Sequence, residues 1–206
     1  MRIQSDYLVV GSGVAGLYFA LKAAEHGSVT LVTKRETRES NTSYAQGGIA
    51  SVSDGDDSAA MHVRDTLEAG AGLCDPVAVE VGVREGPALV EELIDLGTRF
   101  SRKSSGELSL GREGGHSRAR IVHADDLTGQ EISRALQATL ASMPSVSIFD
   151  YHLAVDLIVD QTPRCRGVHA LDTRSGRVEA FTAPVTGEAG SRVKTLVAGS
   201  AADVMD

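Results

Sequence analysis

One stretch decides the predicted fold: DYLVVGSGVAGL, residues 6–17. In it an apolar strand runs into the turn G-x-G-x-x-G, and a helical pattern follows. Gly11 permits a tight turn, Gly13 lets the backbone approach a pyrophosphate, and Gly16 allows the helix to pack closely on the strand. The phosphates would lie at the positive N-terminal end of the helix. The stretch therefore predicts a Rossmann-like α/β fold that binds a dinucleotide.

Composition limits the partners. The 206 residues are 42% hydrophobic and 23% charged, as in ordinary globular proteins. The net charge of −8 argues against nucleic acid and anionic membranes, because both favour positive patches. Glycines interrupt the apolar residues 7–24 and Asp6 precedes them, so we expect neither a signal peptide nor a membrane span. Cys74 and Cys165 resemble the free thiols of a cytoplasmic protein, with a single disulfide as the alternative.

The chain continues as a helix and a second strand. An apolar helical face spans Leu17 to Ala24, Gly27 is placed to end the helix, and residues 28–33 form a β-branched strand of parallel-sheet type. Lys34 then stands where a generic dinucleotide fold carries an acidic residue for a ribose hydroxyl, with Glu36 beyond it. Taken alone, Lys34 is best explained as a solvated surface side chain.

The next part of the chain is predicted to be helical. Three helices are expected: one capped by Asp57 or Ser58 and ended by Gly70-Ala71-Gly72, one starting at Asp75-Pro76, and one restarted by Pro87 and ending at Gly97.

Some patterns in this region allow a second interpretation. The alternating valines at 77–83 also fit a strand, but the Asp-Pro start signal favours a helix. Asp54, Asp56 and Asp57 resemble a calcium loop, but the other ligand positions are missing, so a solvated turn is expected. We expect His62 at the surface or at the edge of the core.

The sequence pattern of the C-terminal half predicts one helix and a small β-meander. Thr128 and Glu131 have the spacing of a capping box, and the helix that they start ends before Pro144. Strands are then expected at residues 147–151, 154–160, 167–172 and 178–182.

A second motif, ESNTSYAQGGIA at residues 39–50, is rich in small hydroxyls, an amide and paired glycines. Such a segment can wrap a polar heterocycle or form an ordinary loop. Together, GSGVAGL, the following TK and SNTSYAQGGIA resemble the start of the L-aspartate oxidase family, within the wider fumarate reductase/succinate dehydrogenase flavoproteins. Two motifs at matched spacing are more specific than either alone.

The resemblance implies the cofactor FAD. It places the diphosphate at the glycine turn, the adenosine at one lysine and the isoalloxazine and ribityl parts at the second motif: Gly11, Ser12, Gly13, Val14, Ala15, Gly16; Lys34; Asn41, Thr42, Ser43, Tyr44, Ala45, Gln46, Gly47, Gly48. Covalent members carry a histidine in S-H-T, where this chain has Asn41. An amide cannot form that linkage, so non-covalent FAD is expected.

Residues 110–120, LGREGGHSRAR, form a third motif, which is rich in charged side chains. Arginines can bind a dicarboxylate and an acidic group can hold an amine, although an exposed charged loop has the same composition. The resemblance to a T-R-E-G-G-H-S segment implies Glu113 beside the substrate ammonium, with Arg112 and His116 in support. A zinc site at His116 and His123 fails on spacing, so no metal is expected.

The resemblance implies oxidation of L-aspartate to iminoaspartate in NAD biosynthesis, with oxygen or fumarate as acceptor, in the cytoplasm and in partnership with quinolinate synthase. We expect residues 1–185 to be the N-terminal part of the FAD-binding domain and residues 186–206 a tail outside it. The domain is thus expected to be truncated, activity of this chain alone is left open, and no catalytic residue is assigned, since the family's proton-transfer arginine lies beyond this chain. A non-catalytic nucleotide-binding fragment and a fumarate reductase-like flavoprotein are the alternatives.

Overall fold

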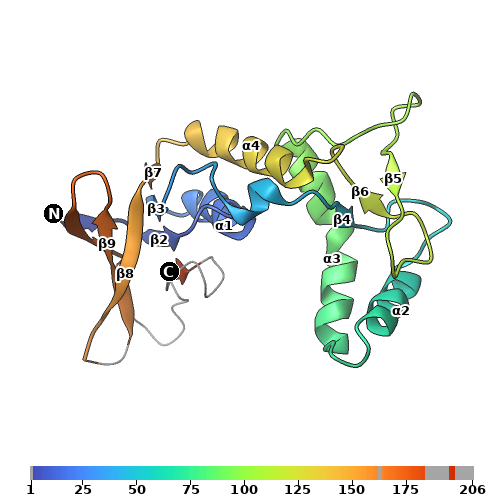
Figure 1. Ribbon diagram of the computed structural model, residues 1–206, viewed down its shortest axis with the longest axis horizontal. Helices are drawn as coiled ribbons and strands as arrows, with labels where there is room; N and C mark the ends of the chain where they lie inside the picture. The colour runs from blue at the N-terminus through green and yellow to red at the C-terminus, as the bar shows by residue number, and fades with distance from the viewer. Residues whose placement is uncertain (1, 162–163, 184–194, 198–206) are drawn as a thin grey trace. The chain divides into compact units, whose positions relative to one another are not determined.

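The protein is described by a computed structural model that covers residues 2–161, 164–183 and 195–197 (Figure 1). It divides into two compact units, Met1–Ser43 with Leu136–Asp206 and Tyr44–Ala135. The predicted tail, residues 186–206, lies outside the described residues except for the backbone of one strand.

The first unit contains a parallel sheet in the order β11-β2-β3-β7. Its strands are β2 (Tyr7–Val10), β3 (Val29–Val32), β7 (Val146–Phe149) and β11 (Thr195–Val197), and every neighbouring pair is parallel. Helix α1 (Val14–Ala24) connects β2 to β3 and packs on both. The predicted Rossmann-like arrangement is therefore confirmed, while β11 was not predicted.

The sequence explains how α1 and β3 pack. All four residues of β3 are buried, and so are Leu17, Ala20 and Leu21 of α1. The predicted role of Gly27 is wrong, because the helix ends at Ala24 and Gly27 does not have positive φ. A Cβ atom on Gly27 would instead lie 2.8 Å from Oδ2 of Asp6, so this glycine permits a close approach.

A second sheet of the same unit contains three of the four strands predicted for the meander. The prediction is wrong for residues 147–151, because β7 pairs in parallel with β3 instead. Strands β8 (His152–Val159), β9 (Cys165–Asp172) and β10 (Arg177–Thr182) pair antiparallel, and β1 (Arg2–Gln4) adds a parallel edge beside β10. Leu8 and Val32 of the parallel sheet form one buried cluster with Val168 and Phe181 of the meander. This shared core joins the two sheets.

The second unit has a three-stranded antiparallel sheet in the order β4-β6-β5. The strands are β4 (Ile49–Ala50), β6 (Ile121–Val122) and β5 (Leu110–Gly111). Helices α2 (Ala59–Ala69) and α3 (Pro76–Asp95) pack against each other (Figure 1), and the boundary between the units falls within α4 (Thr128–Ala141).

Two predictions for the helices are wrong. Pro87 does not restart a helix but lies inside α3, where it lacks the N–H for one backbone hydrogen bond. Gly86 precedes it and offers no Cβ for the proline ring to strike, which eases continuation. Thr128 and Glu131 do not form a capping box: Thr128 Oγ1 accepts from the N–H of Ala124, and Glu131 accepts from the N–H of Arg99.

Candidate functional site

The glycine turn connects β2 to the N-terminus of α1, the position at which dinucleotide-binding folds hold a diphosphate. Gly11 has φ of 101°, a conformation that favours glycine, and its N–H donates to the carbonyl of Val32. Gly13 is the N-cap of α1 and provides no side-chain cap, and the first turn of α1 has no acidic residue. The helix itself therefore places no capping or acidic side chain at its positive end that would compete with an anion.

Residues 41–43 lie beside this turn. Oγ1 of Thr42 accepts from the N–H of Val14 at 3.0 Å, and a Cβ on Gly13 would lie 3.5 Å from the same oxygen. Ser12 is buried and its Oγ is 3.0 Å from Oγ1 of Thr33, so its hydroxyl is used within the protein. The first unit thus brings two predicted FAD segments together.

The end of β3 carries the predicted adenosine residue. Lys34 is exposed there, at the carboxyl edge of the parallel sheet, where ligands of such folds bind. Glu36 accepts from Arg38 Nε at 2.6 Å and from the Tyr151 hydroxyl at 3.0 Å. These bonds, that from Arg38 foremost, lower the pKa of Glu36.

Residues 44–48 lead into β4 in the second unit. The carbonyl of Ala45 accepts from the N–H of Gly129 in the first turn of α4, at 3.0 Å. A Cβ on Gly48 would overlap with the side chain of Ile121 and the carbonyl of Val122 in β6. Glycine at position 48 is therefore required by the close approach of two strands.

The predicted substrate residues Arg112, Glu113 and His116 lie in a hydrogen-bonded turn between β5 and β6, called the substrate turn below. The N–H of His116 donates to the carbonyl of Glu113 at 3.3 Å, and Gly115 has the positive φ, 83°, that a type II turn needs at this position. Nε of Arg112 donates to the carbonyl of His116 at 2.9 Å. A Cβ on Gly47 would lie 4.0 Å from Oε1 of Glu113, so the end of the second motif adjoins this turn.

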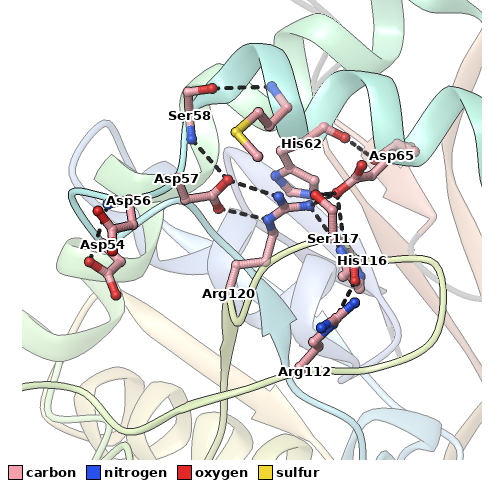
Figure 2. Close-up of polar contacts among 12 residues, drawn as sticks. Asp54, Asp56, Asp57, Ser58, His62, Asp65, Arg112, His116, Ser117 and Arg120 are labelled. Atoms are coloured by element: carbon pink, nitrogen blue, oxygen red, sulfur yellow. Dashed lines mark hydrogen bonds and ion pairs between the residues drawn. The ribbon is translucent and has the colours of Figure 1, made fainter.

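A buried charge network lies beside the turn (Figure 2). Arg120 is fully buried and forms two bonds with Asp57, at 2.7 and 2.8 Å, and one with Asp65 at 2.7 Å. The expectation of a solvated turn is wrong for Asp57, whose side chain is 2% exposed. Hydrogen bonds from the hydroxyl and N–H of Ser117, together with Arg120, hold the pKa of Asp65 well below its ordinary range.

His62 lies within the same network, deeper than the sequence predicted. It is 6% exposed, its ring centroid is 5.7 Å from that of His116, and its Nδ1 has no hydrogen-bond partner among the described residues. Burial lowers the pKa of His62, and the nearby Arg120 lowers it further. The sequence feature that could have indicated this site is the three-residue spacing of His62 and Asp65, which places both polar side chains on one face of α2.

In the part of the chain that the structure describes, no group of three or more His, Cys, Asp or Glu residues is arranged to hold a metal ion. Within the same residues, no helix has the length and apolar character needed to cross a membrane. Cys74 and Cys165, both described, are free thiols.

A parallel sheet, a glycine turn at an open helix end and an antiparallel meander define a dinucleotide-binding α/β protein. A family model described as "FAD binding domain" matches residues 6–199, and the chain belongs to this family. The predicted cofactor, FAD, is thereby confirmed.

The relatives confirm the resemblance noted in the sequence. The chain is 47% identical to the chloroplastic L-aspartate oxidase of Arabidopsis thaliana, over 88% of this chain and 28% of the relative. It is 38% identical to the L-aspartate oxidase of Pseudomonas aeruginosa, over 98% of this chain and 38% of the relative. The chain thus spans about a third of the length of these curated relatives.

Solved structures of other proteins have a similar fold. The E. coli quinol fumarate reductase FrdA superposes with a TM-score of 0.84 at 31% identity, covering 89% of this chain and 32% of that one. A 3-ketosteroid dehydrogenase from Rhodococcus jostii, at 19% identity and a TM-score of 0.73, shares the fold.

Proposed function

We propose that the chain holds FAD and recognises L-aspartate in an L-aspartate oxidase reaction, the oxidation of L-aspartate to iminoaspartate that opens NAD biosynthesis. When bound, FAD accepts the hydride that leaves Cα, and oxygen or fumarate reoxidises it. The protein's own contribution is to bind, orient and discriminate.

The residues proposed to hold FAD fit its parts. The backbone N–H groups of residues 12, 13, 15 and 16, at the N-terminus of α1, are assigned to the diphosphate, because those of Gly11 and Val14 donate to Val32 and Thr42. Lys34 offers a cation beside the adenosine. Residues 41–48 are assigned to the ribityl and isoalloxazine parts. Asn41 cannot form a covalent flavin bond, so the proposal is for non-covalent FAD.

The residues proposed to hold the substrate divide its charges. The carboxylate of Glu113 accepts hydrogen bonds from the ammonium of L-aspartate. Arg112 and His116 donate hydrogen bonds to the carboxylates of L-aspartate. Glu113 would thereby distinguish aspartate from succinate, which has no amino group.

The observation that carries the proposal is the proximity of Gly47 and Glu113, with 4.0 Å between a Cβ on the glycine and Oε1 of the glutamate. Strand β6 pairs with both β4 and β5, so the segment assigned to flavin and the turn assigned to substrate are fixed by one sheet. A flavin and an amino acid must lie in contact for hydride transfer, and this arrangement supports that.

The test uses the full chain loaded with FAD. The visible spectrum reports bound flavin, acid precipitation reports whether the flavin is released, and anaerobic aspartate reports reduction as bleaching. Glu113→Gln keeps an acceptor oxygen but loses the negative charge that pairs with the ammonium, so it should weaken aspartate binding by about tenfold or more and leave succinate binding unchanged.

Exposed Glu85→Gln in α3 is the matched control and should change neither ligand's binding. A protein that takes up no FAD contradicts the proposal, and so does a Glu113→Gln variant that binds aspartate as well as the wild type does. Flavin that stays with acid-precipitated protein favours the fumarate reductase-like alternative.

Two further proposals concern the cell. The free thiols Cys74 and Cys165 support a reducing compartment, the cytoplasm. Transfer of iminoaspartate to quinolinate synthase is proposed on the resemblance alone, and a pull-down with the purified synthase would test it.

A further inference from the structure

Arg120 is a fully buried cation whose donors are directed to three different groups. Two donate to Asp57 and one nitrogen, Nη1, donates to Asp65 at 2.7 Å (Figure 2). The same Nη1 lies 3.2 Å from Nδ1 of His116. Arg120 therefore links the start of α2 to a histidine of the substrate turn.

The chemistry of this last contact fixes the histidine. A guanidinium has donors and no acceptor, so Nδ1 of His116 must be the acceptor. In the neutral ring the proton then resides on Nε2, which remains a donor directed away from Arg120. The contact thus selects one tautomer and one ring orientation.

Asp65 holds the adjoining backbone as well. Its Oδ2 accepts from the N–H of Ser117 at 2.8 Å and from the Ser117 hydroxyl at 2.7 Å. Both the side chain of His116 and the backbone of the next residue are therefore attached to one charge network. Packing by His62, with its ring centroid 5.7 Å away, restricts the His116 ring on another side.

Stability alone is a weak reason for such a network. Burying an ion pair costs much of its Coulomb gain, and apolar residues of similar volume often stabilise a protein equally well. What apolar residues cannot do is direct a hydrogen-bond donor. This favours an orienting role for the buried charges.

We propose that Arg120 is a positioning residue that holds His116 as a fixed Nε2–H donor and, through Asp65 and Ser117, holds the substrate turn in place. This rests on the proposed function, in which His116 serves a carboxylate of the substrate. Arg120 acts through His116 and does not touch the substrate.

The test is nitrogen-15 NMR of histidine-labelled full chain loaded with FAD, without aspartate, followed by aspartate titration. His116→Gln assigns the signal. The wild type should show one non-averaging tautomer with Nδ1 as acceptor. Arg120→Lys keeps the charge but loses the planar fork, so it should give averaged His116 signals and weaken aspartate binding by about tenfold or more. Exposed Arg118→Lys in the same loop should change neither.

Averaged signals in the wild type overturn the proposal, as does an Arg120→Lys protein that loses only thermal stability. If that variant does not fold, Asp57→Asn, which loosens the guanidinium from one side, must give the same spectroscopic change in smaller degree. Because the spectrum is recorded without aspartate, a fixed His116 in a chain that binds no aspartate would refute the proposed function and leave the positioning role standing.

Discussion

Oδ2 of Asp65 accepts two hydrogen bonds from Ser117, at 2.8 Å from the N–H and 2.7 Å from the hydroxyl. These bonds favour the ionised carboxylate, and they join helix α2 to the turn that carries Glu113. The stability of the second unit and the geometry of the candidate substrate turn therefore depend on one titrating group.

The first prediction is that acid destabilises the protein partly through Asp65. An unfolded aspartate titrates near 3.8, and the folded pKa is lower. The unfolded chain then binds more protons in acid, so this contribution to stability is complete above 3.8 and is lost as the pH falls towards the folded pKa. Ser117→Ala removes the bond that lowers the pKa most and should flatten the decline below pH 4. Urea unfolding at pH 6 and pH 3 measures the loss of unfolding free energy between the two pH values. An equal loss in the wild type and in Ser117→Ala would refute the prediction.

The second prediction concerns the buried cation. Arg120→Met leaves the carboxylates of Asp57 and Asp65 buried without their partner, which should cost about 3–5 kcal/mol of unfolding free energy. The control is Arg84→Met, because the Arg84–Glu80 pair is 65% and 54% exposed and should contribute less than about 0.5 kcal/mol. Urea unfolding followed by circular dichroism compares them. Similar losses in the two variants would show that the buried network contributes no more than a surface pair.

Local patterns predicted most of the fold, and tertiary contacts decided the rest. The glycine turn, β3 and the meander strands follow from β-branched runs and turn residues, which act over a few positions. Strands β1 and β11 have three residues each, and pairing with β10 and β2 from distant parts of the chain makes them strands. In α3, burial of Val83, Val90 and Leu93 on one face outweighs the local stop signal of Pro87.

The candidate site divides in the same way. The phosphate turn was predictable because each glycine has a local backbone reason. The partnership of Asp57 with Arg120 was not, because nothing in a local pattern states which carboxylate a distant arginine will meet. Composition suggests a solvated turn for Asp57 and an exposed loop for Arg120. In the structure the two side chains pair and are buried.

The third prediction concerns His62. Its pKa is lowered from 6.5, chiefly by burial, so the unfolded chain binds more protons below that value. The contribution of His62 to stability is therefore complete above pH 6.5 and falls as the pH decreases. His62→Gln should show a smaller difference in unfolding free energy between pH 7.5 and pH 5.5 than the wild type. The other histidines are common to both proteins, so an identical difference would exclude His62 as the cause.

The fourth prediction compares two glycines of the second unit. A Cβ on Gly48 would overlap with the side chain of Ile121 and the carbonyl of Val122, where β4 pairs with β6. Gly48→Ala should therefore cost about 1–3 kcal/mol and weaken FAD binding, because the strands must separate beside residues 44–47.

Gly82 lies inside α3 with no atom within 4 Å of a Cβ built on it, so Gly82→Ala should stabilise the protein by roughly 0.5–1 kcal/mol and leave FAD affinity unchanged. Urea unfolding and fluorescence titration with FAD measure both quantities. Opposite signs are required in stability, since the added methyl group is the same and only its surroundings differ. If Gly48→Ala binds FAD like the wild type, the close approach of β4 to β6 does not position the flavin segment.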